Sequence, residues 1–250
     1  MAIPVASAQP AAQPPKRTMA YNQWTSCPDI EPEFKEIYEL AKPYTMTSLE
    51  RMYGLYQAVR YLVSAEIPGD FVECGVWKGG SAMVVAATLA QLGKTTRNIW
   101  LYDTYAGMPD PTDKDVQFDD LTALDRLRMA GAESYSELAK VTVEEVQANL
   151  RRTGYPLDRV QFVVGDVRQT IPTTAPARIS LLRLDTDWYA STAHEMKHFY
   201  PRLCRGGVLL VDDYGHWKGS RQAVDEYLAS ESPVLLNRLD YTGRIAIKTA

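Results

Sequence analysis

The chain has 250 residues, of which 46% are hydrophobic and 23% are charged, and its formal net charge is -4. This length and composition are ordinary for one globular domain with a single hydrophobic core. The small acidic excess, without a cluster of Lys and Arg, argues against a surface that binds nucleic acids or anionic membranes. No stretch approaches the ~20 apolar residues that a bilayer crossing needs, so we expect a cytoplasmic protein.

The first residues are rich in Ala, Pro and Gln and lack the features of a secretory signal, so residues 1–28 are predicted to form a flexible tail. Residues 29–250 are predicted to form one domain. The three cysteines of the chain, Cys27, Cys74 and Cys204, have no CxxC or Cys/His spacing and fit reduced thiols better than a disulfide framework or a zinc site.

A helical region is expected at about residues 29–66, ahead of the sheet. Apolar residues recur there at helical spacing, and Thr47 with Glu50 resembles a capping box at a helix start. Tyr44 and Met46, just before this start, are candidates for contact with a substrate. Core packing or a subunit contact is the more common role for such side chains.

The stretch from Asp70 to Ser81 is typical of a strand, a glycine turn and a helix. The turn contains Gly75 and Gly79, and the helix beginning near Ser81 offers free backbone N–H groups to an anionic part of a ligand. The turn is not the dinucleotide fingerprint GxGxxG, because Trp77 occupies the position of the second glycine. A tight structural turn therefore remains an alternative to a cofactor loop.

Short apolar runs alternate with helical segments along the rest of the chain. The expected strands are residues 71–74, 98–103, 160–166, 179–185 and 207–213, and the expected helices are residues 81–91, 142–152 and 191–203. This alternation predicts a parallel sheet covered on both faces. Two further runs, residues 234–240 and 243–248, should pair as a hairpin and add an antiparallel strand. That ending resembles the Rossmann-like fold of S-adenosylmethionine (SAM) dependent methyltransferases, a mostly parallel seven-stranded α/β sheet.

Carboxylates lie at or just beyond the carboxyl ends of the expected parallel strands. Ligands of open α/β sheets bind at this edge, and so many like charges there should require a cationic group among them. Asp103 follows the glycine turn at roughly the distance at which an acid binds ribose hydroxyls, about 20 residues, although it could instead cap a turn. Asp166 is placed to reach the adenine edge. The acids concerned are Glu73, Asp103, Asp166, Asp185, Asp212 and Asp213.

Asp185, Asp212 and Asp213 are expected on neighbouring strands, with no His or Cys beside them. An all-oxygen set of this kind suits Mg²⁺, Mn²⁺ or Ca²⁺ rather than zinc. The alternative for the Asp212-Asp213 pair is a turn that accepts backbone N–H bonds. Asp187 is either a spare acid beside this set or, as we expect, the cap of the helix near Tyr189.

The sequence resembles the macrocin O-methyltransferase family over about residues 44–248. The resemblance rests on five ordered motifs, FVECGVWKGGSA, LYDTYAGMPDP, GDVRQTIP, LLRLDTDWYAST and GGVLLVDDYGHWKGSRQAVDEY. It implies a SAM- and Mg²⁺-dependent enzyme that methylates sugar hydroxyls of antibiotics such as macrolides and aminocoumarins. An insertion at about residues 105–140 would cover the acceptor as a lid.

The resemblance also implies roles for individual residues. The metal ligands would be Asp185, Asp212 and Asp213, with Asp185 also as the general base, and the cofactor contacts would fall around Glu73, Gly75, Ser81, Asp103 and Asp166. The remaining candidates follow from position alone: Gly79 belongs to the cofactor turn, and Tyr44 and Met46 are the substrate candidates. His216, just after the Asp pair, is a rival base or a solvent-exposed bystander.

Two other functions remain open at this stage. One keeps the SAM fold but methylates a phenol or catechol. The other is a nicotinamide-dependent oxidoreductase, against which the missing GxGxxG and the missing Tyr-x-x-x-Lys pair count. The expected partners are a small glycosylated acceptor and further copies of the chain in a homo-oligomer, with neither nucleic acid nor membrane.

Overall fold

The computed structural model describes residue 24 and residues 27–131 and 140–250. The chain divides into two compact units, residues 1–31 and 32–250, and the sheet with its helices belongs to the second. The predicted tail therefore lies almost entirely outside the described residues. In the described part of the chain, no helix combines the length and the apolar character that a membrane crossing requires.

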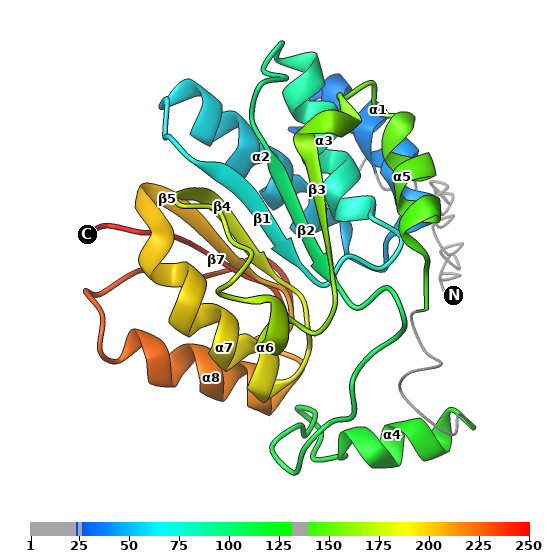
Figure 1. Cartoon of the computed structure of the whole chain (residues 1–250), viewed down its shortest axis with the longest axis vertical. Helices are drawn as coiled ribbons and strands as arrows, with labels where there is room; N and C mark the ends of the chain where they lie inside the picture. Colours follow the sequence, from blue (N-terminus) through cyan, green and yellow to red (C-terminus); the bar gives the residue numbers. More distant parts are fainter. Residues whose placement is uncertain (1–23, 25–26, 132–139) are drawn as a thin grey trace, which may run out of the picture. The chain divides into compact units, whose positions relative to one another are not determined.

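A seven-stranded sheet in the order β3-β2-β1-β4-β5-β7-β6 forms the centre of residues 32–250 (Figure 1). The strands are β1 (Asp70–Cys74), β2 (Ile99–Asp103), β3 (Val160–Val164), β4 (Ile179–Leu184), β5 (Leu203–Val211), β6 (Asn237–Arg238) and β7 (Arg244–Ile247). The first five run parallel, and β7 pairs antiparallel with both β5 and β6. The predicted hairpin and the seven-stranded, mostly parallel sheet are confirmed. The strand order reverses between β1 and β4, which is where open α/β sheets bind ligands.

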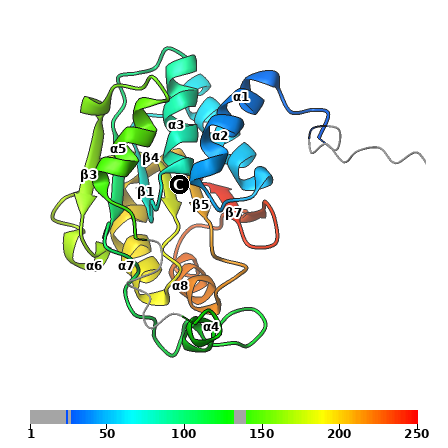
Figure 2. The same cartoon turned by 90° about the vertical axis from the view of Figure 1, so that its right-hand side faces the viewer.

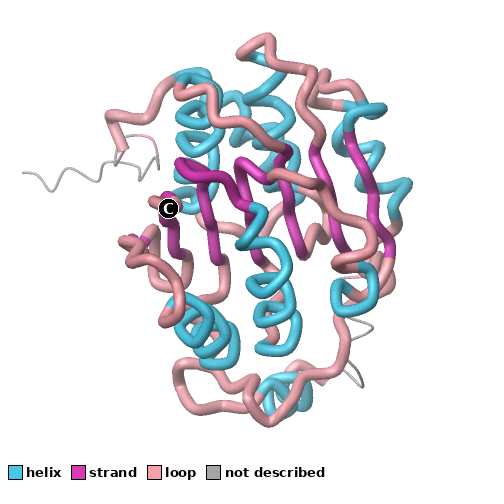
Figure 3. The backbone as a smooth tube through the Cα atoms, turned by 60° about the vertical axis from the view of Figure 1, so that its left-hand side comes forward, coloured by secondary structure: helices cyan, strands magenta, loops and turns pink. Residues whose placement is uncertain are grey.

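Helices cover both faces of the sheet (Figures 1 and 3). One group is α1 (Pro32–Ala41), α2 (Leu49–Ser64), α3 (Gly80–Gln91) and α5 (Val143–Arg151), with the short η1 (Lys42–Tyr44). The other is α6 (Val167–Thr170), α7 (Tyr189–Phe199) and α8 (Lys218–Leu228). Two further short turns, η3 (Leu157–Arg159) and η4 (Tyr200–Arg202), precede β3 and β5. Because side chains alternate along a strand, each central strand contributes to both layers.

One short helix, α4 (Ala123–Met129), belongs to the segment between β2 and α5. Figure 2 shows it on the side of α7 and α8, away from α1 and α3. Hydrogen bonds link the segment to that side, since Gln117 forms a β-bridge with Trp217 and Tyr189 donates its backbone N–H to the carboxylate of Asp115. The predicted lid, residues 105–140, includes this segment, and residues 132–139 lie outside the described ones.

Several helix starts differ from the prediction. Helix α2 is capped by Ser48, whose hydroxyl accepts the N–H of Arg51, and not by Thr47. Trp188, and not Asp187, is the residue at the start of α7. Helix α5, expected at residues 142–152, begins with a capping box formed by Thr142 and Glu145. The sequence did not predict helices α4, α6 and α8: α4 and α6 have only 7 and 4 residues, and α8 buries mostly small residues, so none shows a long apolar stripe.

Candidate functional site

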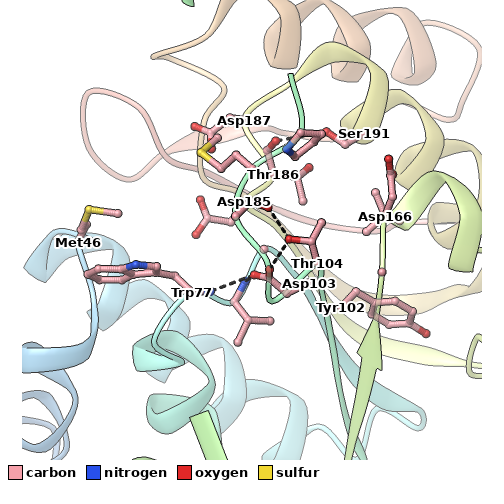
Figure 4. A pocket seen from close by; sticks show the side chains of 17 residues that line it. Met46, Trp77, Tyr102, Asp103, Thr104, Asp166, Asp185, Thr186, Asp187 and Ser191 are labelled. Atoms are coloured by element: carbon pink, nitrogen blue, oxygen red, sulfur yellow. Dashed lines mark hydrogen bonds between the residues drawn. The ribbon is translucent and has the colours of Figure 1, made fainter. Parts of the chain in front are cut away.

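A pocket opens at the carboxyl ends of β1, β2, β3 and β4 (Figure 4). Five of the predicted site residues line it, namely Met46, Gly75, Asp103, Asp166 and Asp185. The remaining lining comes mainly from the turn after β1, the loop after β2 and the start of α7, including Val76, Trp77, Thr104, Gly107, Met108, Pro109, Thr186, Asp187 and Ser191. The pocket therefore lies at the position where the sequence predicts the cofactor.

Gly75 allows the ends of β1 and β4 to meet at the floor of this pocket. Its φ is +83°, and a Cβ atom there would lie 1.8 Å from the carbonyl oxygen of Asp185. A side chain is excluded by the protein itself, before any ligand is considered. Trp77, two residues on, has a φ of +46° and lines the pocket, where the fingerprint of a dinucleotide fold would have glycine.

Asp103 ties this turn to the end of β2. One carboxylate oxygen accepts the N–H groups of Val76 and Trp77 at 2.7 and 3.1 Å, and the other accepts the N–H of Tyr105 at 2.9 Å. Asp103 therefore does cap this turn, which was the alternative role considered from the sequence. The side chain also faces the pocket, so it can shape the glycine turn and contact a ligand at once (Figure 4).

Asp166 lies across the pocket, at the end of β3. It caps α6 by accepting the N–H of Arg168, and its carboxylate is also paired with the Arg168 guanidinium at 2.5 Å. The side-chain hydrogen bond from Arg168 holds the pKa of Asp166 below its usual value. The carboxylate is therefore ionised and fixed in direction at neutral pH.

Four of the eight predicted cofactor- and substrate-binding residues do not line the pocket. Glu73 is buried, paired with Arg183, and lines a small space under α2 together with Leu55. Ser81 is also buried, with its hydroxyl 3.9 Å from the sulfur of Met52. Gly79 begins α3 in a left-handed conformation and is close to Val146. Tyr44 is the last residue of η1, and the guanidinium of Arg152 lies 5.9 Å from its ring.

Asp185, Asp212 and Asp213 come together beside the pocket. Each offers a carboxylate oxygen within 4.8 Å of those of the other two. Desolvation raises the pKa of Asp185 and Asp213 well above the usual aspartate value, and repulsion from neighbouring carboxylates raises both further. A divalent cation would oppose both effects, and carboxylate oxygens are the ligands that Mg²⁺ prefers. The donor set therefore fits a hard divalent cation.

Two arginines that the sequence analysis did not single out supply positive charge at this cluster. Arg183, 3% exposed on β4, lies 2.7 Å from Glu73 and 2.8 Å from both Asp185 and Asp212. Arg51 of α2 also pairs with Asp212, and its Nε lies 2.9 Å from Asp240. The two arginines thus supply part of the positive charge that was expected among the acids. A sequence signal existed, since Arg183 is the one charged residue within the apolar run ISLLRL.

Asp187 connects the cluster to the start of α8. Its backbone N–H donates to Asp213 at 3.1 Å, and its carboxylate accepts the indole N–H of Trp217 at 2.7 Å. Desolvation raises the pKa of Asp187 to about 6. Asp187 therefore bonds to two other segments, and its predicted role as the cap of α7 is wrong.

His216 follows the cluster in the loop after β5, and its backbone N–H donates to the carbonyl of Asp213. Its Nε2 lies 2.9 Å from the amide nitrogen of Gln117, whose oxygen accepts from Arg126. An arginine can only donate, so this arrangement makes the Gln117 nitrogen a donor and the Nε2 of His216 an acceptor. Desolvation, aided by Arg126, lowers the pKa of His216. The imidazole is therefore neutral, with its free electron pair already bonded.

The sheet order, the antiparallel β7 and the pocket at the switch point define a Rossmann-like methyltransferase. The chain belongs to the macrocin O-methyltransferase (TylF) family, which it matches over residues 37–245. It is an enzyme that uses SAM. Membership excludes the nicotinamide-dependent oxidoreductase considered from the sequence.

Characterised relatives carry names of O-methyltransferases that act on antibiotics. The chain is 34% identical over 201 residues to the 8-demethyl-8-(2,3-dimethoxy-alpha-L-rhamnosyl)-tetracenomycin-C 4'-O-methyltransferase of Streptomyces olivaceus, covering 80% of this chain and 73% of the relative. It is 33% identical to the mycinamicin III 3''-O-methyltransferase of Micromonospora griseorubida, covering 74% and 70%.

Solved structures agree with the fold. The O-methyltransferase NovP superposes with a TM-score of 0.72 at 31% identity, covering 83% of each chain. The calicheamicin methyltransferase CalS11 shares the fold, with a TM-score of 0.58 at 20% identity over 96% of this chain and 99% of the other.

Proposed function

We propose that this enzyme is a SAM- and Mg²⁺-dependent O-methyltransferase that methylates a sugar hydroxyl of a glycosylated natural product. The observation that carries the proposal is the position of Asp185, which both lines the pocket and belongs to the three-carboxylate cluster. A cofactor site and a cation site that share one residue can bring a methyl donor and an activated hydroxyl together. The names of the relatives support a sugar as the acceptor.

The cofactor would bind in the pocket at the ends of β1 to β4. Asp103, at the end of β2, is positioned to accept hydrogen bonds from ribose hydroxyls, and Asp166 faces the pocket from the end of β3. Trp77 and Met46 provide apolar surface at the same mouth (Figure 4). Glu73 would influence the cofactor site indirectly, through its ion pair with Arg183. Gly79 and Ser81 would do so by fixing the position of α3.

Asp185, Asp212 and Asp213 would hold the metal. Bound Mg²⁺ would lower the pKa of a coordinated sugar hydroxyl, which is a poor nucleophile at neutral pH. Asp185 is the proposed proton acceptor, because it alone of the three also lines the pocket. His216 is the alternative base, but its Nε2 already accepts from Gln117.

The test separates cofactor binding from chemistry. After dialysis against EDTA, calorimetry with SAM should give an affinity within about threefold of the metal-loaded value, because the pocket does not need the metal to form. Methyl transfer from labelled SAM to a rhamnoside should fall to background and return on addition of Mg²⁺. Full activity in excess EDTA would overturn the metal assignment and leave the cofactor assignment standing.

A further inference from the structure

Three aromatic side chains meet beside the acidic cluster, although the sequence separates them widely. Phe118 comes from the segment before α4, His216 from the loop after β5, and Tyr241 from the turn between β6 and β7. The Phe118 ring centroid lies 5.7 Å from that of His216 and 6.3 Å from that of Tyr241, and the latter two lie 6.0 Å apart. The Tyr241 ring is steeply inclined to both others, at 70° and 80°, so the three form a corner and not a flat stack. We call this group the aromatic corner.

The aromatic corner is exposed but firmly held. Phe118 is 58% exposed and Tyr241 is 55% exposed, which is unusual for large apolar rings. Yet Arg126 of α4 binds the side chains on either side of Phe118, those of Gln117 and Asp119, and Phe118 donates its backbone N–H to the carbonyl of His216. Exposed rings on a fixed backbone bind a partner with little loss of conformational entropy.

Two short links connect the aromatic corner to the proposed metal ligands. The backbone N–H of His216 donates to the carbonyl of Asp213, and Thr242, next to Tyr241, donates its hydroxyl to the carbonyl of Asp212 at 2.7 Å. The corner therefore continues the reaction site beyond its carboxylates.

Hydrogen bonds on both sides hold the His216 ring within the aromatic corner. Its Nε2 accepts from Gln117, which leaves the proton on Nδ1, 3.3 Å from the hydroxyl oxygen of Tyr241. These bonds orient the imidazole and the phenol together. Because both nitrogens are already hydrogen-bonded, covering this ring with an apolar ligand leaves no polar atom without a partner.

We propose that Phe118, His216 and Tyr241 bind the apolar group attached to the sugar that is methylated, and so select aryl or polyketide-like glycosides over simple sugars. This inference rests on the proposed function. A sugar hydroxyl at the carboxylate cluster places the rest of the acceptor over the adjoining surface, and that surface is aromatic. Aromatic side chains are the usual apolar lining of small-molecule sites.

The probes are 4-nitrophenyl α-L-rhamnopyranoside and methyl α-L-rhamnopyranoside, which differ only in the group attached to the sugar. Calorimetry of the enzyme loaded with Mg²⁺ and S-adenosylhomocysteine should show tighter binding of the aryl glycoside. Phe118→Ala and Tyr241→Ala should each weaken the aryl glycoside about 3- to 10-fold, as expected for the loss of one aromatic contact, and leave the methyl glycoside unchanged. In turnover the change should appear in KM for the aryl glycoside and not in kcat.

The controls distinguish a loss of the aromatic contact from a folding defect and from a failure of the proposed function. Leu235→Ala removes a side chain that is 75% exposed outside the aromatic corner and should change neither affinity, while Tyr241→Phe keeps the ring and should retain most of the preference. Equal binding of both glycosides by the wild type, or unchanged aryl affinity in both alanine variants, would overturn the inference. Failure of methyl transfer to either glycoside, with the binding preference intact, would instead overturn the proposed function.

Discussion

Arg183 determines how the carboxylates of the site can stay close together. Its guanidinium reaches Glu73, Asp185 and Asp212 from near the carboxyl end of the buried strand β4, where an unpaired charge would be strongly destabilising. Desolvation raises the pKa of Glu73 to about 7, despite the opposing charge of Arg183. The arginine therefore offsets only part of the cost of burying these carboxylates, which leaves room for the added charge of a metal.

Substitutions in the cluster should separate the proton acceptor from the other ligands. Asp185→Asn keeps the shape and one oxygen ligand but cannot accept a proton, so the rate at saturating Mg²⁺ should fall roughly 10²- to 10⁴-fold. Asp212→Asn and Asp213→Asn should mainly weaken metal binding, and excess Mg²⁺ should restore part of their rate. Rates measured across a Mg²⁺ titration make the distinction. Recovery of Asp185→Asn to nearly the wild-type rate would make it a ligand only and direct attention to His216.

Glu195 gives a stability prediction that is independent of catalysis. It is fully buried on α7 and accepts the hydroxyl of Thr186 at 3.0 Å, and desolvation raises its pKa to about 8 from 4.5. A carboxyl whose pKa is raised by folding stabilises the folded state at low pH, and this contribution is lost as the pH rises from about 4.5 to about 8.

Glu195→Gln should therefore remove the loss of stability at high pH, because glutamine does not ionise. Relative to the wild type, the variant should gain about 2 to 4 kcal/mol in free energy of unfolding between pH 5 and pH 8.5, by the linkage of protonation to folding. Urea unfolding at several pH values measures the difference, and Glu226→Gln, on the exposed end of α8, is the matched control. Parallel pH curves for wild type and Glu195→Gln would show that Glu195 ionises normally in the folded protein.

At the level of elements, two connections position the site. The turn between β1 and α3 is fixed to the end of β2 by Asp103, and the β6–β7 hairpin is fixed to α2 by Asp240. The carboxylate of Asp240 accepts the hydroxyl of Ser48 at 2.7 Å and the Nε of Arg51 at 2.9 Å. Ser48 thus both caps α2 and binds the hairpin, which explains why it replaces Thr47 at the helix start.

Asp103→Ala should weaken SAM binding by about 2 to 4 kcal/mol, through loss of hydrogen bonds to a charged group and of the bonds that hold the turn. Asp103→Asn keeps an acceptor for the turn, so it should fall between the wild type and the alanine variant. Calorimetric titration with SAM measures all three. An unchanged affinity in Asp103→Ala would mean that the end of β2 does not contact the cofactor.

At the level of the whole molecule, the ends of four strands form the pocket, so a ligand can bind there only when the sheet is folded. Ligand at 100 times its Kd stabilises a folded protein by about 2.7 kcal/mol. For a protein of this size that corresponds to a rise in Tm of about 5 to 10 °C.

S-adenosylhomocysteine should therefore raise the Tm by about this amount in differential scanning calorimetry. NADH at the same concentration should leave the Tm unchanged, since the turn after β1 lacks the dinucleotide fingerprint. A shift with NADH and none with S-adenosylhomocysteine would contradict the assignment of the pocket.

The sequence alone determined the sheet, its terminal hairpin and the location of the site. Apolar runs of strand length alternate with helices, and the carboxyl ends of parallel strands must share one edge, so Asp103, Asp166, Asp185 and the Asp212-Asp213 pair could be placed together before the structure was known. Family motifs added the expected cofactor chemistry.

Only the tertiary structure decided which side chains face one another across strands and loops. Strand alternation directs Glu73 beneath α2 to Arg183, away from the pocket, and the register of β1 with β4 makes Gly75 necessary. The aromatic corner joins three segments that have no local sequence relationship. Such contacts depend on the packing of distant elements, which local periodicity and spacing do not specify.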